Sequence, residues 1–344
     1  MAYISFQPSD HYNTTIYTGT GGVQTITGVG FQPDFTWIKD RDVTKWHCQV
    51  DTVRGYSKYI YSNATSLEAT VTDRLTSWNS DGFVLGAGVE TNTNTNNLVS
   101  WNWKAGTTTG IAGSPDITPS SYSFNQTAGF SIIAYTGSGS AGDTIPHGLG
   151  VAPKMVIIKR LDSGSAWVCY HERIDATAPE DYHILLNANA VRVDSTGGWN
   201  DTAPSSTLIT LGGDNVTSSG TFIAYCFADI KGYSKFGSYE GTGDADGPFI
   251  YTGFRPAFFL LKSATAVENW YMLDNKRLGY NDANRFLFPD ETAVEIAKTN
   301  SLLSNGVKMG TPDGSTNGSG QTFIYAAFAE FPLVSSNDVP GVAR

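Results

Sequence analysis

The fold is decided by a stretch that the chain contains three times, first as Phe31-Gln32-Pro33-Asp34-Phe35-Thr36-Trp37-Ile38-Lys39. The second copy is Val151-Ala152-Pro153-Lys154-Met155-Val156-Ile157-Ile158-Lys159, and the third is Phe254-Arg255-Pro256-Ala257-Phe258-Phe259-Leu260-Leu261-Lys262. In each copy a proline precedes a short apolar run, and a lysine closes it. Such a run, bounded by turn residues, is typical of a buried β-strand. The chain therefore repeats one structural unit.

Further landmarks recur at matched distances from these prolines. A Tyr-x-Gly segment precedes each copy, a Leu-Gly or Met-Gly pair follows it, and an aromatic strand closes the unit. The segments are Tyr17-Thr18-Gly19, Tyr135-Thr136-Gly137 and Tyr239-Glu240-Gly241, then Leu85-Gly86, Leu211-Gly212 and Met309-Gly310, then residues 99–103, 223–227 and 324–328. So many landmarks in register predict three copies of one module.

The composition favours strands joined by turns. Of 344 residues only 16% are charged, against about 25% in an average soluble protein. Aromatic residues make up 12%, and 37 residues are glycine. We predict an all-β protein of three tandem antiparallel β-sandwich modules. The expected modules are residues 1–105, 122–232 and 233–331, with a linker at 106–121 and a tail at 332–344. The one segment with helical character is 290–303.

Charge and cysteine usage exclude several classes of protein. The net charge of −10 argues against a nucleic-acid partner, because phosphate binding needs a basic surface. No apolar run is long enough to insert in a membrane, and no secretion signal is visible. Three cysteines far apart in the sequence form neither a disulfide framework nor a zinc motif, so we expect three free thiols.

A tryptophan follows each repeated lysine by seven or eight residues, and a cysteine or methionine lies two residues after the tryptophan. Positions i and i+2 of a strand share a face. We therefore predict that each pair packs in the core of its own module, as Trp46 with Cys48, Trp167 with Cys169, and Trp270 with Met272.

No catalytic constellation emerges from the spacing of reactive residues. The five histidines lack metalloprotease spacing, and Gly137-Ser138-Gly139 misses the nucleophile-elbow pattern. Asp244-Ala245-Asp246-Gly247 begins like a calcium loop but lacks the remaining ligands. We predict no catalytic residues, no metal and no cofactor.

The remaining candidates are aromatic side chains that could stack on a glycan. Tyr56, Tyr59 and Tyr61 lie in one strand-like segment, in which Tyr59 and Tyr61 would share a face, while Trp78 and Trp199 lie in polar surroundings. The alternative for each is packing inside the protein.

The modules resemble a family of virion structural proteins of marine tailed phages. The resemblance rests on residues 17–21, 31–39, Asp51-Thr52-Val53-Arg54-Gly55, 80–86 and 101–106. It is closest in the first module, and Asp-x-x-Arg-Gly has no clean copy in the other two. The resemblance implies a jelly-roll or lectin-like β-sandwich on the exterior of the virion, made in the host cytoplasm. It supplies no catalytic residues.

The resemblance implies a tail-fibre or receptor-binding component, and the lack of a catalytic constellation in the sequence predicts that it is non-enzymatic. Its expected partners are other virion proteins, further copies of itself (with a trimer favoured, as in similar fibres) and a host surface glycan. One alternative is a capsid decoration or head-fibre protein, because the chain begins almost directly in the first module. A second is a polysaccharide depolymerase, which would gather acidic side chains in one groove.

Overall fold

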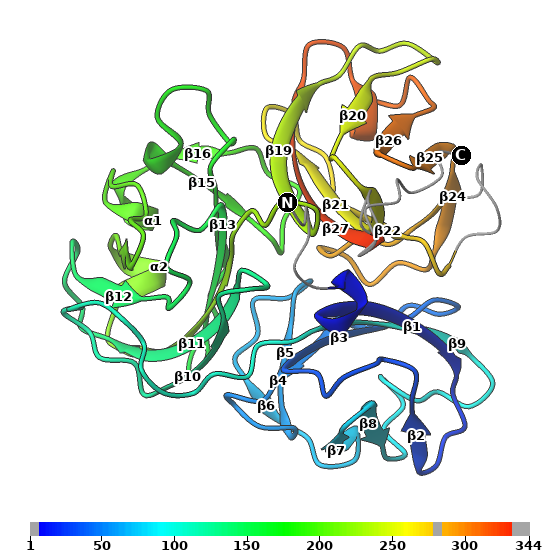
Figure 1. Cartoon of the computed structure of the whole chain (residues 1–344), viewed down its shortest axis with the longest axis horizontal. Helices are drawn as coiled ribbons and strands as arrows, with labels where there is room; N and C mark the ends of the chain where they lie inside the picture. Colours follow the sequence, from blue (N-terminus) through cyan, green and yellow to red (C-terminus); the bar gives the residue numbers. More distant parts are fainter. Residues whose placement is uncertain (1–6, 278–283, 332–344) are drawn as a thin grey trace.

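The structure is a computed structural model that describes residues 7–277 and 284–331. It is all-β, built from antiparallel sheets, and each helix has three or four residues. Within these ranges no helix has the length and hydropathy needed to cross a bilayer. Three larger sheets are arranged around a common centre (Figure 1). We refer to residues 12–103, 121–227 and 234–331 as lobes 1, 2 and 3.

Lobe 1 has a six-stranded sheet in the order β1-β9-β3-β4-β5-β6 and a three-stranded sheet β2-β8-β7. Its strands are β1 (Tyr12–Thr18), β2 (Gln24–Ile26), β3 (Phe35–Asp40), β4 (Cys48–Asp51), β5 (Lys58–Tyr61), β6 (Ala69–Thr70), β7 (Leu75–Asn79), β8 (Gly82–Leu85) and β9 (Asn97–Trp103), and the short helix η1 (Pro8–Asp10) precedes them.

Lobe 2 has a seven-stranded sheet β10-β11-β18-β13-β14-β15-β16 and a two-stranded sheet β12-β17. The strands are β10 (Ser121–Asn125), β11 (Phe130–Gly137), β12 (Thr144–Pro146), β13 (Met155–Arg160), β14 (Trp167–His171), β15 (Tyr182–Leu185), β16 (Val193–Asp194), β17 (Leu208–Thr210) and β18 (Gly220–Phe227), and the helices are η2 (Pro179–Asp181), α1 (Thr196–Trp199) and α2 (Asp214–Thr217).

Lobe 3 has a four-stranded sheet β19-β27-β21-β22, a three-stranded sheet β20-β26-β25 and the pair β23-β24. The strands are β19 (Ser234–Glu240), β20 (Phe249–Tyr251), β21 (Arg255–Ser263), β22 (Tyr271–Asp274), β23 (Asn284–Phe286), β24 (Ile296–Lys298), β25 (Asn300–Leu303), β26 (Gly306–Met309) and β27 (Thr322–Phe331), and the one helix is α3 (Gly314–Asn317).

The repeated stretch forms the same strand in each lobe, namely β3, β13 and β21. Each pairs with the closing aromatic strand of its lobe at the same distance from the proline. The matched pairs are Trp37 with Trp101, Ile157 with Tyr225, and Leu260 with Ala326. These registers define equivalent positions in the three lobes.

Both faces of these strands are buried, which explains why the sequence shows an apolar run rather than an alternation. In β13, Met155 and Ile157 point into a core shared by all three lobes, whereas Val156 and Ile158 point into the core of lobe 2. The strands β3 and β21 divide their side chains in the same way.

The repeated glycines are needed because backbone passes directly over them. A Cβ on Gly19 would lie 2.1 Å from the carbonyl oxygen of Thr93, and one on Gly241 would lie 2.2 Å from that of Gly318. Gly137 is equally crowded, with the carbonyl oxygen of Ser218 at 2.4 Å. In each lobe the tyrosine two residues earlier donates a hydrogen bond to the same crossing segment.

Two expectations about local structure are wrong. Segment 290–303 forms β24 and β25 instead of a helix, since β24 pairs with β23 and β25 with β26. Thr292, Val294 and Ile296 alternate, and β-branched residues favour the extended conformation.

The other error is a shift of one residue. Cys48 pairs with Ile38 in lobe 1, whereas Trp167 pairs with Lys159 in lobe 2, so the position of Trp167 and Trp270 is filled in lobe 1 by His47. Trp46 therefore faces the core of lobe 1 and is only partly buried, while Trp167 and Trp270 lie in the shared core.

Candidate functional site

The structure separates the aromatic residues singled out for glycan stacking. Tyr56 is 46% exposed and Trp78 is half-buried against Phe83. Tyr59 and Trp199 have no exposed surface, so neither can stack on a glycan and the prediction is wrong for both. The hydroxyl of Tyr59 accepts a hydrogen bond from the backbone N–H of Leu75 at 2.7 Å, and Trp199 packs edge-on against Tyr170. Tyr61 is also buried.

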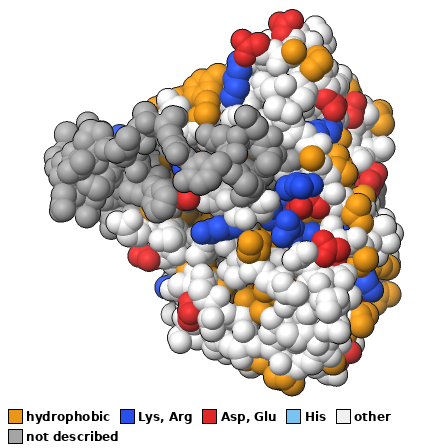
Figure 2. Space-filling model, turned by 90° about the vertical axis from the view of Figure 1, so that its right-hand side faces the viewer, with side chains coloured by type: hydrophobic (Ala, Val, Ile, Leu, Met, Phe, Trp, Pro, Cys, Tyr) orange, Lys and Arg blue, Asp and Glu red, His pale blue; other side chains and the backbone are white. Residues whose placement is uncertain are grey.

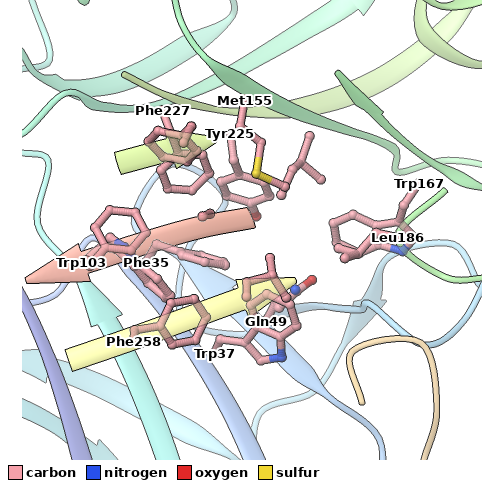
Figure 3. Close-up of a pocket in the computed structure, with 15 residues that line it drawn as sticks. Phe35, Trp37, Gln49, Trp103, Met155, Trp167, Leu186, Tyr225, Phe227 and Phe258 are labelled. Carbon is pink, nitrogen blue, oxygen red and sulfur yellow. The ribbon is translucent and has the colours of Figure 1, made fainter. Parts of the chain in front are cut away.

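The inner faces of the three larger sheets meet in an aromatic core (Figure 3). Rings of different lobes are in contact there, with centroids 4.6 Å apart for Phe35 and Tyr225 and 5.6 Å apart for Trp103 and Phe328. The rings and Gln49 surround a cavity of about 30 Å³. A cavity of that volume accommodates about one water molecule, so the centre of the molecule packs the lobes together and leaves no room for a substrate.

A buried polar contact crosses each seam between lobes at equivalent positions. At the seam between lobes 1 and 2, the hydroxyl of Tyr225 donates a hydrogen bond to the carboxylate of Asp51 at 2.7 Å. Asp51 also forms an ion pair with Arg54 of its own lobe at 2.6 Å. At the seam between lobes 3 and 1, Trp101 donates its indole N–H to Asp274 at 2.9 Å, and Asp274 is paired with Arg277 at 2.6 Å. Asp274 and Arg277 therefore form a second copy of the Asp-x-x-Arg part of the pattern. The expectation that the pattern has no copy outside the first module is wrong for this part.

The seam between lobes 2 and 3 uses different chemistry at the same place. The equivalent of Trp101 and Tyr225 is Ala326, which has no side-chain donor. The equivalent of the aspartate is His171, whose Nε2 lies 3.0 Å from the carbonyl oxygen of Tyr325, while its Nδ1 accepts a hydrogen bond from the N–H of Arg173. These partners fix a neutral imidazole that donates from Nε2. Burial lowers the pKa of His171 to about 4.

Backbone hydrogen bonds close the same three seams. At each one, two segments exchange a pair of N–H···O=C bonds. They are Glu68 N to Leu161 O and Ser165 N to Thr65 O (2.8 and 2.9 Å), Arg192 N to Ala264 O and Glu268 N to Asn189 O (both 3.0 Å), and Glu295 N to Arg41 O and Lys45 N to Thr292 O (3.0 and 3.2 Å). Because lobe 3 binds lobe 1 as lobe 1 binds lobe 2, the ring of lobes is closed.

The repeated lysines fix the turns that make these backbone contacts. The ammonium groups of Lys39 and Lys262 each donate to two carbonyl oxygens of their own turn. Lys159 donates to Arg160 O and also across the seam to Thr65 O, at 3.4 Å. Burial lowers the pKa of all three lysines to about 8. Their recurrence is thus explained by turn structure.

An accessible groove of about 660 Å³ lies where lobe 1 meets the connecting segment 104–120 and β10. We call it the linker groove. It is lined by Gln32, Asp34, Thr52, Val53, Lys104, Gly106, Thr108 and residues 120–123. Asp34 is 8% exposed, and its carboxylate accepts hydrogen bonds from Thr52 Oγ1 and the N–H of Ala105, both at 2.9 Å, and from Ser123 Oγ at 3.3 Å.

Burial raises the pKa of Asp34, and its three hydrogen bonds and the nearby Lys104 oppose that shift. Sequence reasoning missed this groove, although a signal was available. The residue after the repeated proline is Asp34 in the first copy, but Lys154 and Ala257 in the others. A departure from the repeat at this point marks a feature that lobe 1 alone has.

Charged groups elsewhere form ion pairs, and the densest group is at the seam between lobes 3 and 1, where Arg41, Arg277 and Arg285 lie 2.9, 3.0 and 3.8 Å from Glu295. Among residues 7–277 and 284–331, no three His, Cys, Asp or Glu side chains are placed to hold a metal ion together. On the face in Figure 2, acidic and basic side chains are interspersed among uncharged ones. The three cysteines are free and buried, and burial raises the pKa of Cys48 and Cys226 to about 12.

The fold and seams define an all-β protein whose three lobes close around one aromatic core. The chain belongs to the DUF7483 family, described as a domain of unknown function, and residues 7–332 match the family model. Comparisons with curated proteins and with solved structures gave no significant match.

Proposed function

We propose that the chain is a non-enzymatic structural and binding protein on the exterior of a phage particle, as a tail-fibre or receptor-binding component that contacts host surface glycans. The closed ring of lobes carries this proposal. Its aromatic core, its buried polar contacts and the ion pair between Arg41 and Glu295 hold the lobes together. Such a construction suits a rigid body that presents its loops and grooves to a partner. The link to a virion rests on the sequence resemblance.

In this proposal each lobe is one copy of a jelly-roll or lectin-like β-sandwich, with boundaries near residues 1–105, 122–232 and 233–331 and a linker at 106–121. The equivalent registers of β3, β13 and β21 support a common module. So does the pairing of a larger with a smaller sheet in every lobe. The proposed tail, 332–344, lies outside the described residues.

Imaging of intact particles tests the assignment. Phage particles labelled with antibody against this chain should carry the label on the tail fibres. Label on the head surface would replace the fibre with a capsid decoration or head-fibre protein. Particles without any label would refute the virion assignment.

Binding and mass measurements test the rest. Purified protein should bind host cells and leave their surface polysaccharide intact, because release of sugar fragments would identify a depolymerase. Light scattering should give the mass of a homo-oligomer, with three chains expected by similarity to phage fibres. The mass of one chain would show that the closed ring of lobes is the complete assembly.

A further inference from the structure

The linker groove has the construction of a binding site. Its lining includes a buried carboxylate, that of Asp34, which three hydrogen-bond donors hold in place. An ionised carboxylate offers about four lone-pair positions, so one remains for a ligand hydroxyl. The volume of about 660 Å³ falls within the range of about 300–1,000 Å³ that is usual for small-molecule sites.

The walls offer further groups of the kind that bind sugars. The side chains of Gln32, Thr108 and Ser121 are exposed and polar. Val53 and Tyr122 are half-buried and add apolar surface against which the C–H face of a sugar ring can pack. Within the lining, Asp34 and Lys104 are the two charged residues, and their charges cancel.

From these features we infer that the linker groove binds a neutral saccharide. This inference rests on the proposed function and deepens it by naming the place and the chemical class of the glycan. Because Asp34 and Lys104 offset each other, the groove has no net charge that would favour an anionic or a cationic ligand, so a ligand rich in hydroxyls and without charge fits best. Asp34 and Gln32 accept and donate to these hydroxyls, and Tyr122 packs against the ring.

In the part of the chain that the structure describes, the joint between lobes 1 and 2 differs from the joint between lobes 2 and 3. Lobes 1 and 2 are joined by the long segment 104–120, which forms one wall through the paired bridge between Thr107 and Phe124. Lobes 2 and 3 are joined by residues 228–233, which are too few to form such a wall. We therefore infer one saccharide site for each chain.

The test uses the purified full-length chain and surface polysaccharide of the host, cleaved and separated by anion exchange into neutral and acidic fragments. Calorimetry measures binding to each fraction. One variant, Ser121→Tyr, places a bulky side chain in the groove, and a second, Gln32→Ala, removes an exposed hydrogen-bonding group. The matched control is Ser238→Tyr, an exposed serine of β19 outside the groove. Equal melting temperatures confirm that the variants fold.

We expect the wild-type chain and Ser238→Tyr to bind neutral fragments equally, and Ser121→Tyr to bind about tenfold more weakly or worse. Gln32→Ala should weaken binding to a smaller extent. Binding that is the same in Ser121→Tyr and wild type, or that is confined to acidic fragments, would overturn the groove inference and leave the proposed function standing. Failure of the wild-type chain to bind any fragment would instead refute the glycan-binding function itself.

Discussion

Replacing Tyr225 by phenylalanine tests whether the polar contacts at the seams stabilise the ring of lobes. The substitution keeps the ring that packs against Phe35 and removes only the hydroxyl, which donates to Asp51 at 2.7 Å and accepts from Arg54 at 3.3 Å. Asp51 has no exposed side-chain surface and Arg54 only 4%, so water cannot replace the lost partner.

A hydrogen bond to a buried charged group contributes about 1.5–3 kcal/mol, and the Asp51–Arg54 ion pair remains in the variant. We therefore expect the free energy of unfolding to fall by about 1.5–3 kcal/mol. With an unfolding entropy of about 2.1 cal/mol/K per residue, a chain of 344 residues should melt about 2–4 °C lower.

Calorimetry and urea unfolding measure this change, and Tyr56→Phe is the control. Tyr56 is 46% exposed, so removal of its hydroxyl should change the stability by less than about 0.5 kcal/mol. A double-mutant cycle with Asp51→Asn should give a coupling energy above about 0.5 kcal/mol between the two lobes. A loss in Tyr225→Phe no larger than in Tyr56→Phe, or a coupling energy near zero, would refute the reasoning.

Four further outcomes are expected. Trp167→Ala should lower the free energy of unfolding by about 3–5 kcal/mol in urea titrations, because the indole is wholly buried and donates across a seam. Gly19→Ala should cost about 1–3 kcal/mol, as its Cβ would meet backbone, whereas Gly22→Ala, with open space around it, should melt like wild type. His171 binds a proton near pH 6.5 in the unfolded chain but only near pH 4 in the folded protein. The stability that the neutral imidazole contributes is therefore lost as the pH falls from about 6.5 to 4. The melting temperature of His171→Gln should decline less steeply over that range than the melting temperature of the wild type. Thiol titration should detect none of the three cysteines at neutral pH in the native protein and three in denaturant without reductant.

The local β-structure could be predicted from the sequence because it depends on short patterns. An apolar run after a proline identifies a strand, and the glycine of Tyr17-Thr18-Gly19 recurs because backbone crosses it. The predicted equivalence of the tryptophans was wrong because the repeat in lobe 1 is shifted by one residue relative to lobe 2. Trp46 and Trp167 look equivalent by residue type, yet strand register places His47 at the position of Trp167.

The seams and the groove could not be predicted in this way, because they depend on contacts between distant parts of the chain. Polar surroundings in the sequence suggested that Trp199 is exposed, whereas tertiary packing against Tyr170 buries it. Similarly, nothing in the sequence around Asp51 or around Tyr225 indicates that the two side chains form a hydrogen bond.

The seam between lobes 3 and 1 has a consequence for synthesis of the protein on the ribosome. Trp101 can meet its partner Asp274 only after residue 274 has been translated, although lobe 1 ends at residue 103. At about 5–20 residues per second, that interval is about 10–35 s. During it Trp101 and Trp103, on the inner face of lobe 1, lack their contacts with Phe258 of lobe 3. The nascent chain therefore passes through a stage at which aggregation competes with folding, and closure of the last seam ends it.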